Sequence, residues 1–202
     1  SRGLGDVYKR QNLPGFSVSR KLDKLGMHSS DTAELFFDDM QIPAENMIGQ
    51  EGEGFIYQMQ QFQHERFVTL PLAYVASKQN ILMTIEHIKE RVVFGKPLIK
   101  RQVLRHRLAD WLTEIEALKR LTYHIVGMKT AGIDVTKEVS MGKLMAGRVA
   151  HTGADGCLQM FGGLGYMAEM PITRAFRDSR LTAIGGGADE VMEEIIARME
   201  GF

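Results

Sequence analysis

Three long stretches of the sequence between residues 54 and 161 repeat apolar positions at helical intervals. The clearest covers residues 104–125, where apolar side chains recur every three or four positions and the pattern stops near Gly132. A similar stretch precedes it at residues 54–92. A third follows at residues 134–161, with Asp134 as a plausible N-cap. The pattern therefore predicts three long helices.

A shorter helix is expected at residues 189–199, after a connecting segment that extends to Asp178 and a loop of three glycines at residues 185–187. Four antiparallel helices joined by short loops form a bundle. The fold class we predict is mainly α, an antiparallel four-helix bundle with a short β segment at its N-terminal side.

Proline and glycine positions refine the first helix. Pro71 falls inside it and predicts a bend one to two turns after Glu65, which would either help to aim that side chain or simply accommodate a neighbouring helix. Gly95, followed by Pro97, is expected to end the helix.

The first fifty residues follow a different pattern. Short alternating runs at residues 16–19 and 32–37 predict β-strands, and glycines near position 50 mark the change to helical spacing. Residues 1–11 fit no pattern and are interpreted as a non-native leader. We therefore expect three parts: the leader at 1–11, the end of a β-domain at 12–50 and a helical domain at 51–202.

The third helix is unusually rich in small residues, which cost helix stability unless something approaches closely. Either tight helix packing or the approach of a ligand would compensate. The small residues are Ser140, Gly142, Ala146, Gly147, Ala150, Gly153, Ala154, Gly156 and Cys157.

Charge and composition describe an ordinary globular protein. Lysine plus arginine equals aspartate plus glutamate at 25 each, so no net field attracts nucleic acid, which we do not expect as a partner. The basic cluster at residues 100–107 is either a solvated face or a contact for cofactor phosphates. The histidines lack metal-ligand spacing, so we expect no zinc site.

Cysteine use and hydropathy favour an intracellular protein. Cys157 has no second cysteine to pair with, and its small and apolar neighbours predict that it is buried in a reducing compartment. No run of about 18 apolar residues and no secretory signal are present, so we expect no membrane insertion.

Glu65 is the candidate catalytic base. It borders an apolar stripe on the first helix, where partial burial is expected. Partial burial raises the pKa of a carboxyl group towards neutrality, which suits a group that takes a proton from carbon. The alternative is an ordinary solvated or ion-paired glutamate. The stripe consists of Phe55, Met59, Phe62, Arg66 and Leu70.

Four short motifs occur in an order that resembles the C-terminal half of an acyl-CoA dehydrogenase. They are residues 63–66 (QHER), 91–96 (RVVFGK), 159–163 (QMFGG) and 185–187 (GGG). The resemblance extends from Leu13 to Phe202, and it implies a chain that covers about half of the family's usual length.

The resemblance implies an FAD-dependent enzyme that introduces a double bond between Cα and Cβ of an acyl-CoA thioester. In most of the family the base lies in the loop before the last helix, at the position of Gly186 here. The long-chain and isovaleryl types instead carry it on the long helix, in a Glu-Arg pair that Glu65 and Arg66 resemble. The resemblance therefore implies that Glu65 is the base. It also implies that Arg66 organises the CoA end or the pocket; a structural salt bridge is the alternative.

The other motifs resemble cofactor-binding elements of the family. Arg91 matches an arginine that meets the flavin pyrophosphate, and Phe94 an aromatic residue that packs beside the cofactor. Gln102 and Gln159 match flavin-contacting glutamines. The pair Gly162 and Gly163 matches glycines near the adenine end, although the bare pattern is also that of a helix C-cap followed by a turn.

Several further expectations come with the resemblance. Some of these residues reach the flavin of a neighbouring subunit in the family, which implies a homodimer or homotetramer. Electron-transferring flavoprotein is the expected electron acceptor, and a medium-chain, long-chain or branched acyl-CoA the expected substrate. The compartment would be bacterial cytoplasm or the mitochondrial matrix. The alternatives are an acyl-CoA oxidase and a helical oligomerisation module without activity.

Overall fold

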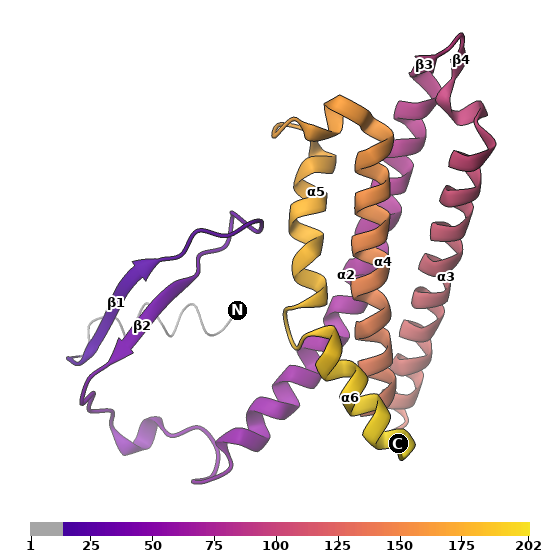
Figure 1. Cartoon of the computed structure of the whole chain (residues 1–202). Coiled ribbons are helices and arrows are strands. Elements are labelled where there is room, and N and C mark those ends of the chain that lie inside the picture. Colours follow the sequence, from indigo (N-terminus) through magenta and orange to yellow (C-terminus); the bar gives the residue numbers. More distant parts are fainter. Residues whose placement is uncertain (1–13) are drawn as a thin grey trace. The chain divides into compact units, whose positions relative to one another are not determined.

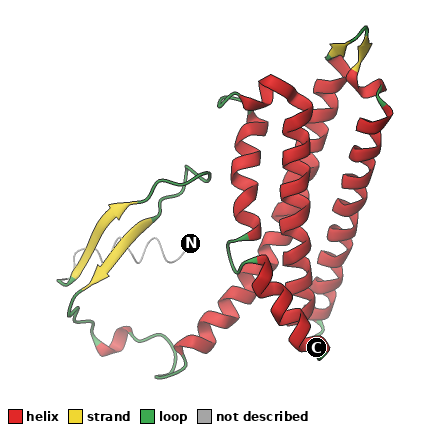
Figure 2. Ribbon diagram, in the orientation of Figure 1, coloured by secondary structure: helices red, strands yellow, loops and turns green. Residues whose placement is uncertain are grey.

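The computed structural model describes residues 14–202, so the predicted leader at residues 1–11 lies outside the described part (Figure 1). The chain divides into two compact units between Gln58 and Met59, and each unit is described by itself. The predicted domain boundaries at residues 11 and 50 stay predictions. Figure 2 shows strands joined by long loops in the described part of the first unit, and mainly helices in the second.

The first unit contains a two-stranded antiparallel sheet. Strand β1 (Phe16–Lys21) pairs with strand β2 (Ala33–Phe37), and the ladder is irregular between Val18 and Arg20. Phe16 lies opposite Phe37, and their ring centroids are 5.4 Å apart. Both predicted strands are therefore confirmed. A short 3-10 helix, η1 (Ala44–Asn46), follows the sheet.

Five α-helices account for most of the remaining described residues and confirm the mainly α class. Within the described chain, no helix combines the length and the apolar character that crossing a bilayer requires. The helices are α2 (Gly54–Glu90), α3 (Gln102–Thr130), α4 (Thr136–Phe161), α5 (Pro171–Ser179) and α6 (Asp189–Glu200).

Helix α4 is the centre of the bundle and contacts α3, α5 and α6. It also lies along α2 in the same direction, because Gln63 near the start of α2 donates a hydrogen bond to Thr136 and His87 near its end stacks on Phe161. Helix α3, which connects α2 to α4 in sequence, runs in the opposite direction to both, so neighbours along the chain are antiparallel, as the short loops predicted. Pro71 lies inside α2, and Figure 1 shows the axis of this helix changing direction along its length.

Two helix predictions need correction. The segment before Asp178 was expected to be a plain connection, but it contains α5, which begins with Pro171 at its first turn and buries Ile172. At nine residues, α5 offers only one repeat of the helical spacing, with Ile172 followed by Ala175 and Phe176. Helix α4 begins at Thr136 with Val135 as its N-cap. Asp134 instead accepts a hydrogen bond from the Thr136 hydroxyl at 2.8 Å.

The end of α2 also differs from the prediction. The helix ends at Glu90, and a small hairpin of β3 (Val92–Val93) and β4 (Lys96–Pro97) follows. Phe94 and Gly95 both have positive φ, at 53° and 74°, as the central residues of a two-residue hairpin turn often do. Gly95 therefore closes a hairpin and does not cap the helix.

The small residues of α4 are explained largely by packing. A Cβ built on Gly142 would lie 2.4 Å from the Leu70 side chain, and one on Gly156 would lie 2.1 Å from the Trp111 ring. These glycines let α2 and α3 approach α4 more closely than any larger residue would allow. Cys157 on the same helix is fully buried, as predicted.

Candidate functional site

The three-glycine loop is held by two cationic side chains from different helices. It joins the 3-10 turn η4 (Arg180–Ala183) to α6, and Gly186 and Gly187 have φ values of 71° and 122°. Arg66 on α2 donates from Nε to the Gly186 carbonyl at 2.7 Å. Lys143 on α4 donates from Nζ to the Gly187 carbonyl at 3.0 Å. Consecutive loop carbonyls thus each accept a charge-assisted hydrogen bond.

Burial shapes the electrostatics around this loop. It lowers the pKa of Lys143, an effect that the nearby Arg66 increases and the Asp189 carboxylate opposes. Burial also lowers the pKa of Arg66. It raises the pKa of Asp189, against the attraction of Lys143 and Arg148. Asp189 Oδ1 is buried without a hydrogen-bond partner, so this carboxylate contributes charge rather than a direct contact at that atom.

Glu65 lies next to Arg66 on α2, but its side chain is exposed, and the expected partial burial is wrong for this structure. Its Oε1 accepts a hydrogen bond of 2.9 Å from Gln61. The reason lies in the apolar stripe itself, because Phe55 is 71% exposed and Met59 37%, whereas Leu70 is fully buried. The stripe enters the core only one turn beyond Glu65.

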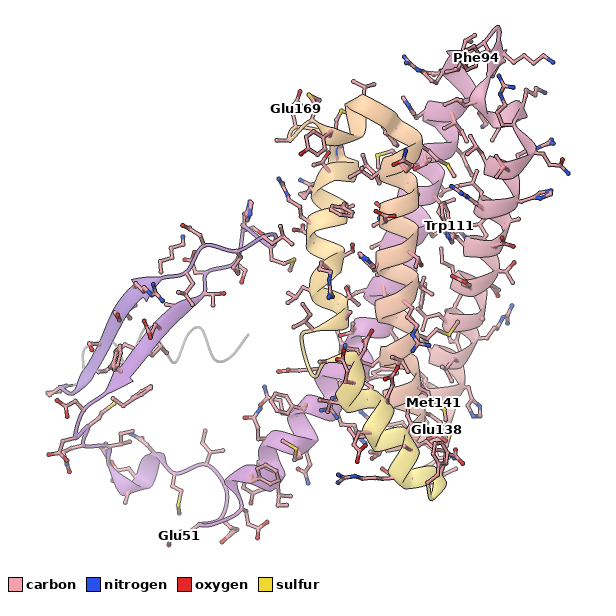
Figure 3. The ribbon with its side chains drawn as sticks, in the orientation of Figure 1. Glu51, Phe94, Trp111, Glu138, Met141 and Glu169 are labelled. Carbon is pink, nitrogen blue, oxygen red and sulfur yellow. The ribbon has the colours of Figure 1, made fainter. Side chains whose placement is uncertain are left out.

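The hairpin end of the bundle presents the other predicted arginine. Arg91 directly follows α2, and its carbonyl accepts a hydrogen bond of 2.8 Å from the Leu98 amide, which closes the base of the hairpin. The Arg91 side chain is exposed. Phe94 is 90% exposed at the tip of the hairpin (Figure 3). Gln102 is the first residue of α3 and is also exposed.

The remaining predicted cofactor residues lie at the C-terminal end of α4. Gln159 is exposed, and its carbonyl accepts a hydrogen bond from the amide of Gly162, which caps the helix at a φ of 62°. Gly162 is therefore the C-cap of α4, which was the alternative interpretation of the Gly162–Gly163 pair. A Cβ built on Gly162 or Gly163 would meet nothing within 4 Å, so the backbone here is open to an approaching group.

The structure thus gathers the predicted residues at two ends of one bundle. At one end, the loop end, Arg66 contacts the glycine loop, and Glu65 precedes it on α2. The hairpin and the end of α4 lie at the other end, the hairpin end. There the ring of His87 on α2 stacks on the ring of Phe161 on α4, with 4.2 Å between the ring centroids. From Glu65 to the end of α2 at Glu90 is 25 residues, roughly 37 Å of helix at about 1.5 Å per residue.

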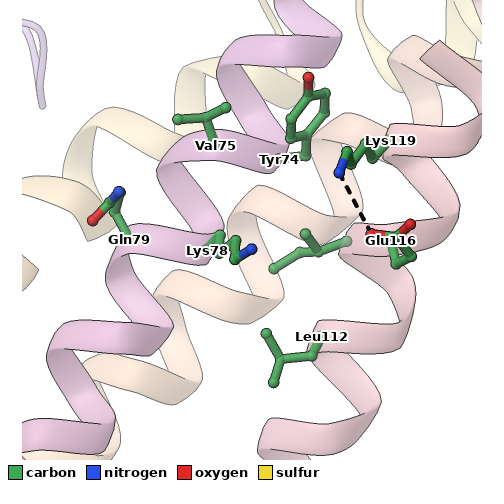
Figure 4. A pocket seen from close by; sticks show the side chains of 8 residues that line it. Tyr74, Val75, Lys78, Gln79, Leu112, Glu116 and Lys119 are labelled. Atoms are coloured by element: carbon green, nitrogen blue, oxygen red, sulfur yellow. Dashed lines mark ion pairs between the residues drawn. The ribbon is translucent and has the colours of Figure 1, made fainter. Parts of the chain in front are cut away.

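A separate hollow of about 320 Å³ lies between α2 and α3. Its wall includes Tyr74, Leu112 and an ion pair of 4.0 Å between Lys119 and Glu116 (Figure 4). None of the predicted site residues line it, so it does not belong to either end.

Lys143 and Asp189 are the two residues of the loop end that the sequence interpretation missed as site residues. A usable signal for Lys143 was present. It lies three residues before Ala146 and four before Gly147, on the small-residue face that was expected to pack tightly. A lysine on such a face needs a polar partner. The loop that supplies this partner is 44 residues away in sequence, and local pattern does not reveal that distance.

The family model described as "Acyl-CoA dehydrogenase, C-terminal domain" matches residues 52–200. The chain is 36% identical over 198 residues to the mitochondrial long-chain specific acyl-CoA dehydrogenase of Sus scrofa, covering 98% of this chain and 46% of that protein. It is 39% identical over 191 residues to the short-chain specific acyl-CoA dehydrogenase of Megasphaera elsdenii, covering 95% and 50%.

A solved structure supports the same relation. The structure of a probable acyl-CoA dehydrogenase from Mycobacterium abscessus is 42% identical, with a TM-score of 0.91, over 95% of this chain and 51% of that one. The chain therefore spans about half the length of the curated relatives it matches.

Proposed function

Since the chain belongs to the acyl-CoA dehydrogenase family, we propose that the protein carrying it is an FAD-dependent enzyme that forms a double bond between Cα and Cβ of an acyl-CoA thioester. In this reaction Cα gives up a proton to a base of the protein and Cβ gives up a hydride. FAD, when bound, supplies the acceptor for that hydride.

Glu65 is the base in this proposal. The observation that carries it is the Arg66–Gly186 hydrogen bond, because it ties the helix segment that contains Glu65 to a loop with no carboxylate of its own. Residues 65 and 66 are adjacent, so the Glu65 side chain leaves α2 about 100° around the helix from the side chain that contacts Gly186, and a substrate lying against Gly186 would have to extend around the helix to meet it. Glu65 is exposed and open to such a substrate. Its carboxylate takes the Cα proton, and hydrogen bonds to the thioester oxygen would stabilise the enolate.

Arg66 has a second role to fill besides tethering the loop. Its Nε is engaged with Gly186, and its guanidinium lies 6.0 Å from the centre of the Phe62 ring. This partly buried cation favours negative charge nearby, including the enolate oxygen or the CoA end of the substrate. We assign Arg66 to substrate binding for that reason.

The donor chemistry of the hairpin end fits the phosphates and amide edges of FAD. Arg91 and Gln102 are exposed donors, and a guanidinium matches a pyrophosphate with forked, charge-assisted hydrogen bonds. Phe94 offers an uncovered ring, and Gln159 an exposed amide. The open backbone at Gly162 and Gly163 would let the cofactor approach closely. These six residues would hold FAD, with the Phe94 ring packing against it and the two glycines leaving room for it.

The separation of the two ends supports a homo-oligomer. Roughly 37 Å of helix lies between Glu65 and the hairpin, so one end would serve the active site of its own chain and the other that of a neighbouring copy. A homodimer or homotetramer is the assembly we propose. Electron-transferring flavoprotein is the proposed electron acceptor, and bacterial cytoplasm or mitochondrial matrix the proposed compartment.

Substrate length is the finer part of the proposal. The relatives include both a long-chain and a short-chain specific enzyme at similar identity, so overall similarity does not select between them. A base on the long helix with a glycine in the loop favours a medium-chain, long-chain or branched acyl group.

The test uses the full-length protein purified with FAD and mixed anaerobically with a panel of acyl-CoAs. A substrate should bleach the flavin absorbance, and Glu65→Gln should retain FAD but bleach about 10²- to 10⁴-fold more slowly. Glu114→Gln, an exposed glutamate on α3, is the matched control. Normal bleaching by Glu65→Gln would refute its role. An oligomer that binds neither FAD nor acyl-CoA would favour a scaffold module, and rapid reoxidation by oxygen an oxidase.

A further inference from the structure

Lys143 is the largest side chain of the described residues that is fully buried. Burying an ammonium group is costly unless it is compensated by hydrogen bonds and opposite charge. Its Nζ donates to the Gly187 carbonyl, and the Asp189 carboxylate attracts it from the start of α6. The reaction proposed above gives this costly group no task, although it contacts the loop against which the substrate would lie.

The loop has little freedom between its neighbours. A Cβ on Gly187 would lie 2.9 Å from the Met192 methyl carbon and 3.3 Å from an Arg66 nitrogen. A Cβ on Gly186 would lie 3.7 Å from Arg66 Cγ. The loop is therefore pressed against Arg66 on one side and α6 on the other, while its backbone keeps two successive positive φ values.

Arg66 and Lys143 act on successive peptide groups from different helices. Arg66 holds the Gly186 carbonyl from α2, and Lys143 holds the Gly187 carbonyl from α4. One tether alone would leave the next peptide group free to rotate. Two tethers on adjacent carbonyls fix both peptide planes, and with them the face that Gly186 presents to Arg66 on α2.

We propose that Lys143 is a positioning residue for the dehydrogenation, which holds the Gly186–Gly187 backbone in the conformation that leaves room for the acyl thioester next to Glu65. This inference rests on the proposed function. Lys143 acts through the loop and does not touch the substrate. Asp189, two residues beyond the loop at the start of α6, provides the opposite charge that offsets part of the cost of burying the ammonium group.

The experiment compares Lys143→Met, which keeps an unbranched side chain one atom shorter and without charge, with Lys143→Arg, which keeps the charge, in the full-length FAD-loaded protein. Two quantities are measured: hydrogen exchange of the amides at residues 184–189, and kcat and KM for an acyl-CoA that bleaches the wild type. Lys137→Met is the control, because Lys137 lies on the same helix and pairs with Glu200 at the surface.

For Lys143→Met we expect loop amides that exchange at least about ten-fold faster and a kcat lowered about ten- to a hundred-fold, since small displacements of a positioned group cost this much. KM and FAD content should change little, and Lys143→Arg should recover part of the kcat. Lys137→Met should match the wild type in all of these.

A folded Lys143→Met protein with wild-type loop exchange and wild-type kcat would overturn the inference. Faster hydrogen exchange of the loop amides without a fall in kcat would also overturn it, because Lys143 would then stabilise the loop without affecting catalysis. If Lys143→Met does not fold, the same criteria apply to Lys143→Gln, which keeps a neutral donor. If no acyl-CoA bleaches even the wild-type protein, the proposed function fails, and the exchange data still decide whether Lys143 braces the loop.

Discussion

The two ends of the helical bundle differ in how their candidate residues are held. At the loop end, Arg66 and the buried Lys143 are engaged with the carbonyls of Gly186 and Gly187. At the hairpin end, the side chains of Arg91 and Phe94 are directed to solvent. The loop end is thus organised by atoms of this chain, whereas the hairpin end offers its groups to something outside it. This is the pattern expected if one end contains the catalytic residues and the other binds a cofactor.

The largest effect should come from moving the base within the loop end. Glu65→Gly should slow flavin bleaching by acyl-CoA about 10²- to 10⁴-fold. Adding Gly186→Glu should restore part of the rate, because a side chain at this position has ordinary contact distance to Arg66. Restoration should stay incomplete, since a φ of 71° costs a non-glycine residue roughly 1 kcal/mol.

Stopped-flow absorbance under anaerobic conditions measures the rate of flavin bleaching in the single and double variants. Gly127→Glu in the Glu65→Gly background is the control, because Gly127 is an exposed helical glycine with open space around it. If Gly127→Glu restores the bleaching rate as well as Gly186→Glu does, any added carboxylate suffices. The proposal that residues 65 and 186 serve the same reacting position would then be wrong.

At the hairpin end, Arg91→Met should weaken FAD binding without touching the base. Loss of a charge-assisted hydrogen-bonding group predicts an FAD Kd about ten- to a hundred-fold higher. Fluorescence titration of the apoprotein with FAD measures it. Arg120→Met, an exposed arginine on α3 outside the basic cluster at residues 100–107, should leave the Kd unchanged. If both arginines have the same effect, Arg91 acts only through general positive charge.

A matched pair of glycines on α4 tests the packing that joins the two ends. Gly156→Ala should lower the free energy of unfolding by about 1–3 kcal/mol, because its Cβ would enter the Trp111 ring. Gly153→Ala should leave the stability unchanged or raise it by up to about 1 kcal/mol, since a Cβ there meets nothing within 4 Å. Urea unfolding measures both, and equal destabilisation would contradict the packing described for α4.

The smallest expected effect is a pH dependence at the loop end. Burial raises the pKa of Asp189 above its ordinary value of 3.8, so the native state binds more protons than the unfolded chain in the pH range just above that value. Stability should therefore fall as pH rises through this range. Asp189→Asn should remove that slope, and the stability of this variant relative to wild type should be more favourable at neutral pH than in acid.

Urea unfolding at several pH values tests this slope. Glu194→Gln, an exposed glutamate further along α6, is the control. A variant whose relative stability is the same at all pH values would show that the Asp189 carboxyl titrates alike in the native and unfolded states.

The sequence predicted most of the long elements because their patterns are long and regular. The apolar spacing of residues 104–125 and the strands near Phe16 and Phe37 are confirmed. The errors fall where a few residues decide the structure. Helix α5 is only nine residues long, and the Phe94–Gly95 turn looked like a helix terminus because glycine serves both.

For the candidate site, sequence could place residues on elements but not measure their burial. Glu65 was expected to be half-buried, and it is exposed because the stripe beside it is uncovered as far as Met59. Lys143 was not selected because its partner, the Gly187 carbonyl, is a backbone atom far along the chain. The roles of Glu65, Arg66, Arg91, Phe94, Gln102, Gln159, Gly162 and Gly163 stay predictions.

The claim that one bundle serves two active sites is tested most directly by mixing two defective chains. Glu65→Gln and Arg91→Met chains are co-expressed with different tags, and the hybrid oligomer is assayed at an FAD concentration that leaves Arg91→Met sites empty. If the two ends serve different sites, each hybrid dimer contains one site with both defects and one with neither, and about half of the wild-type activity should return. Activity no higher than that of the two parent variants would show that both residues serve the same site, and would contradict the account.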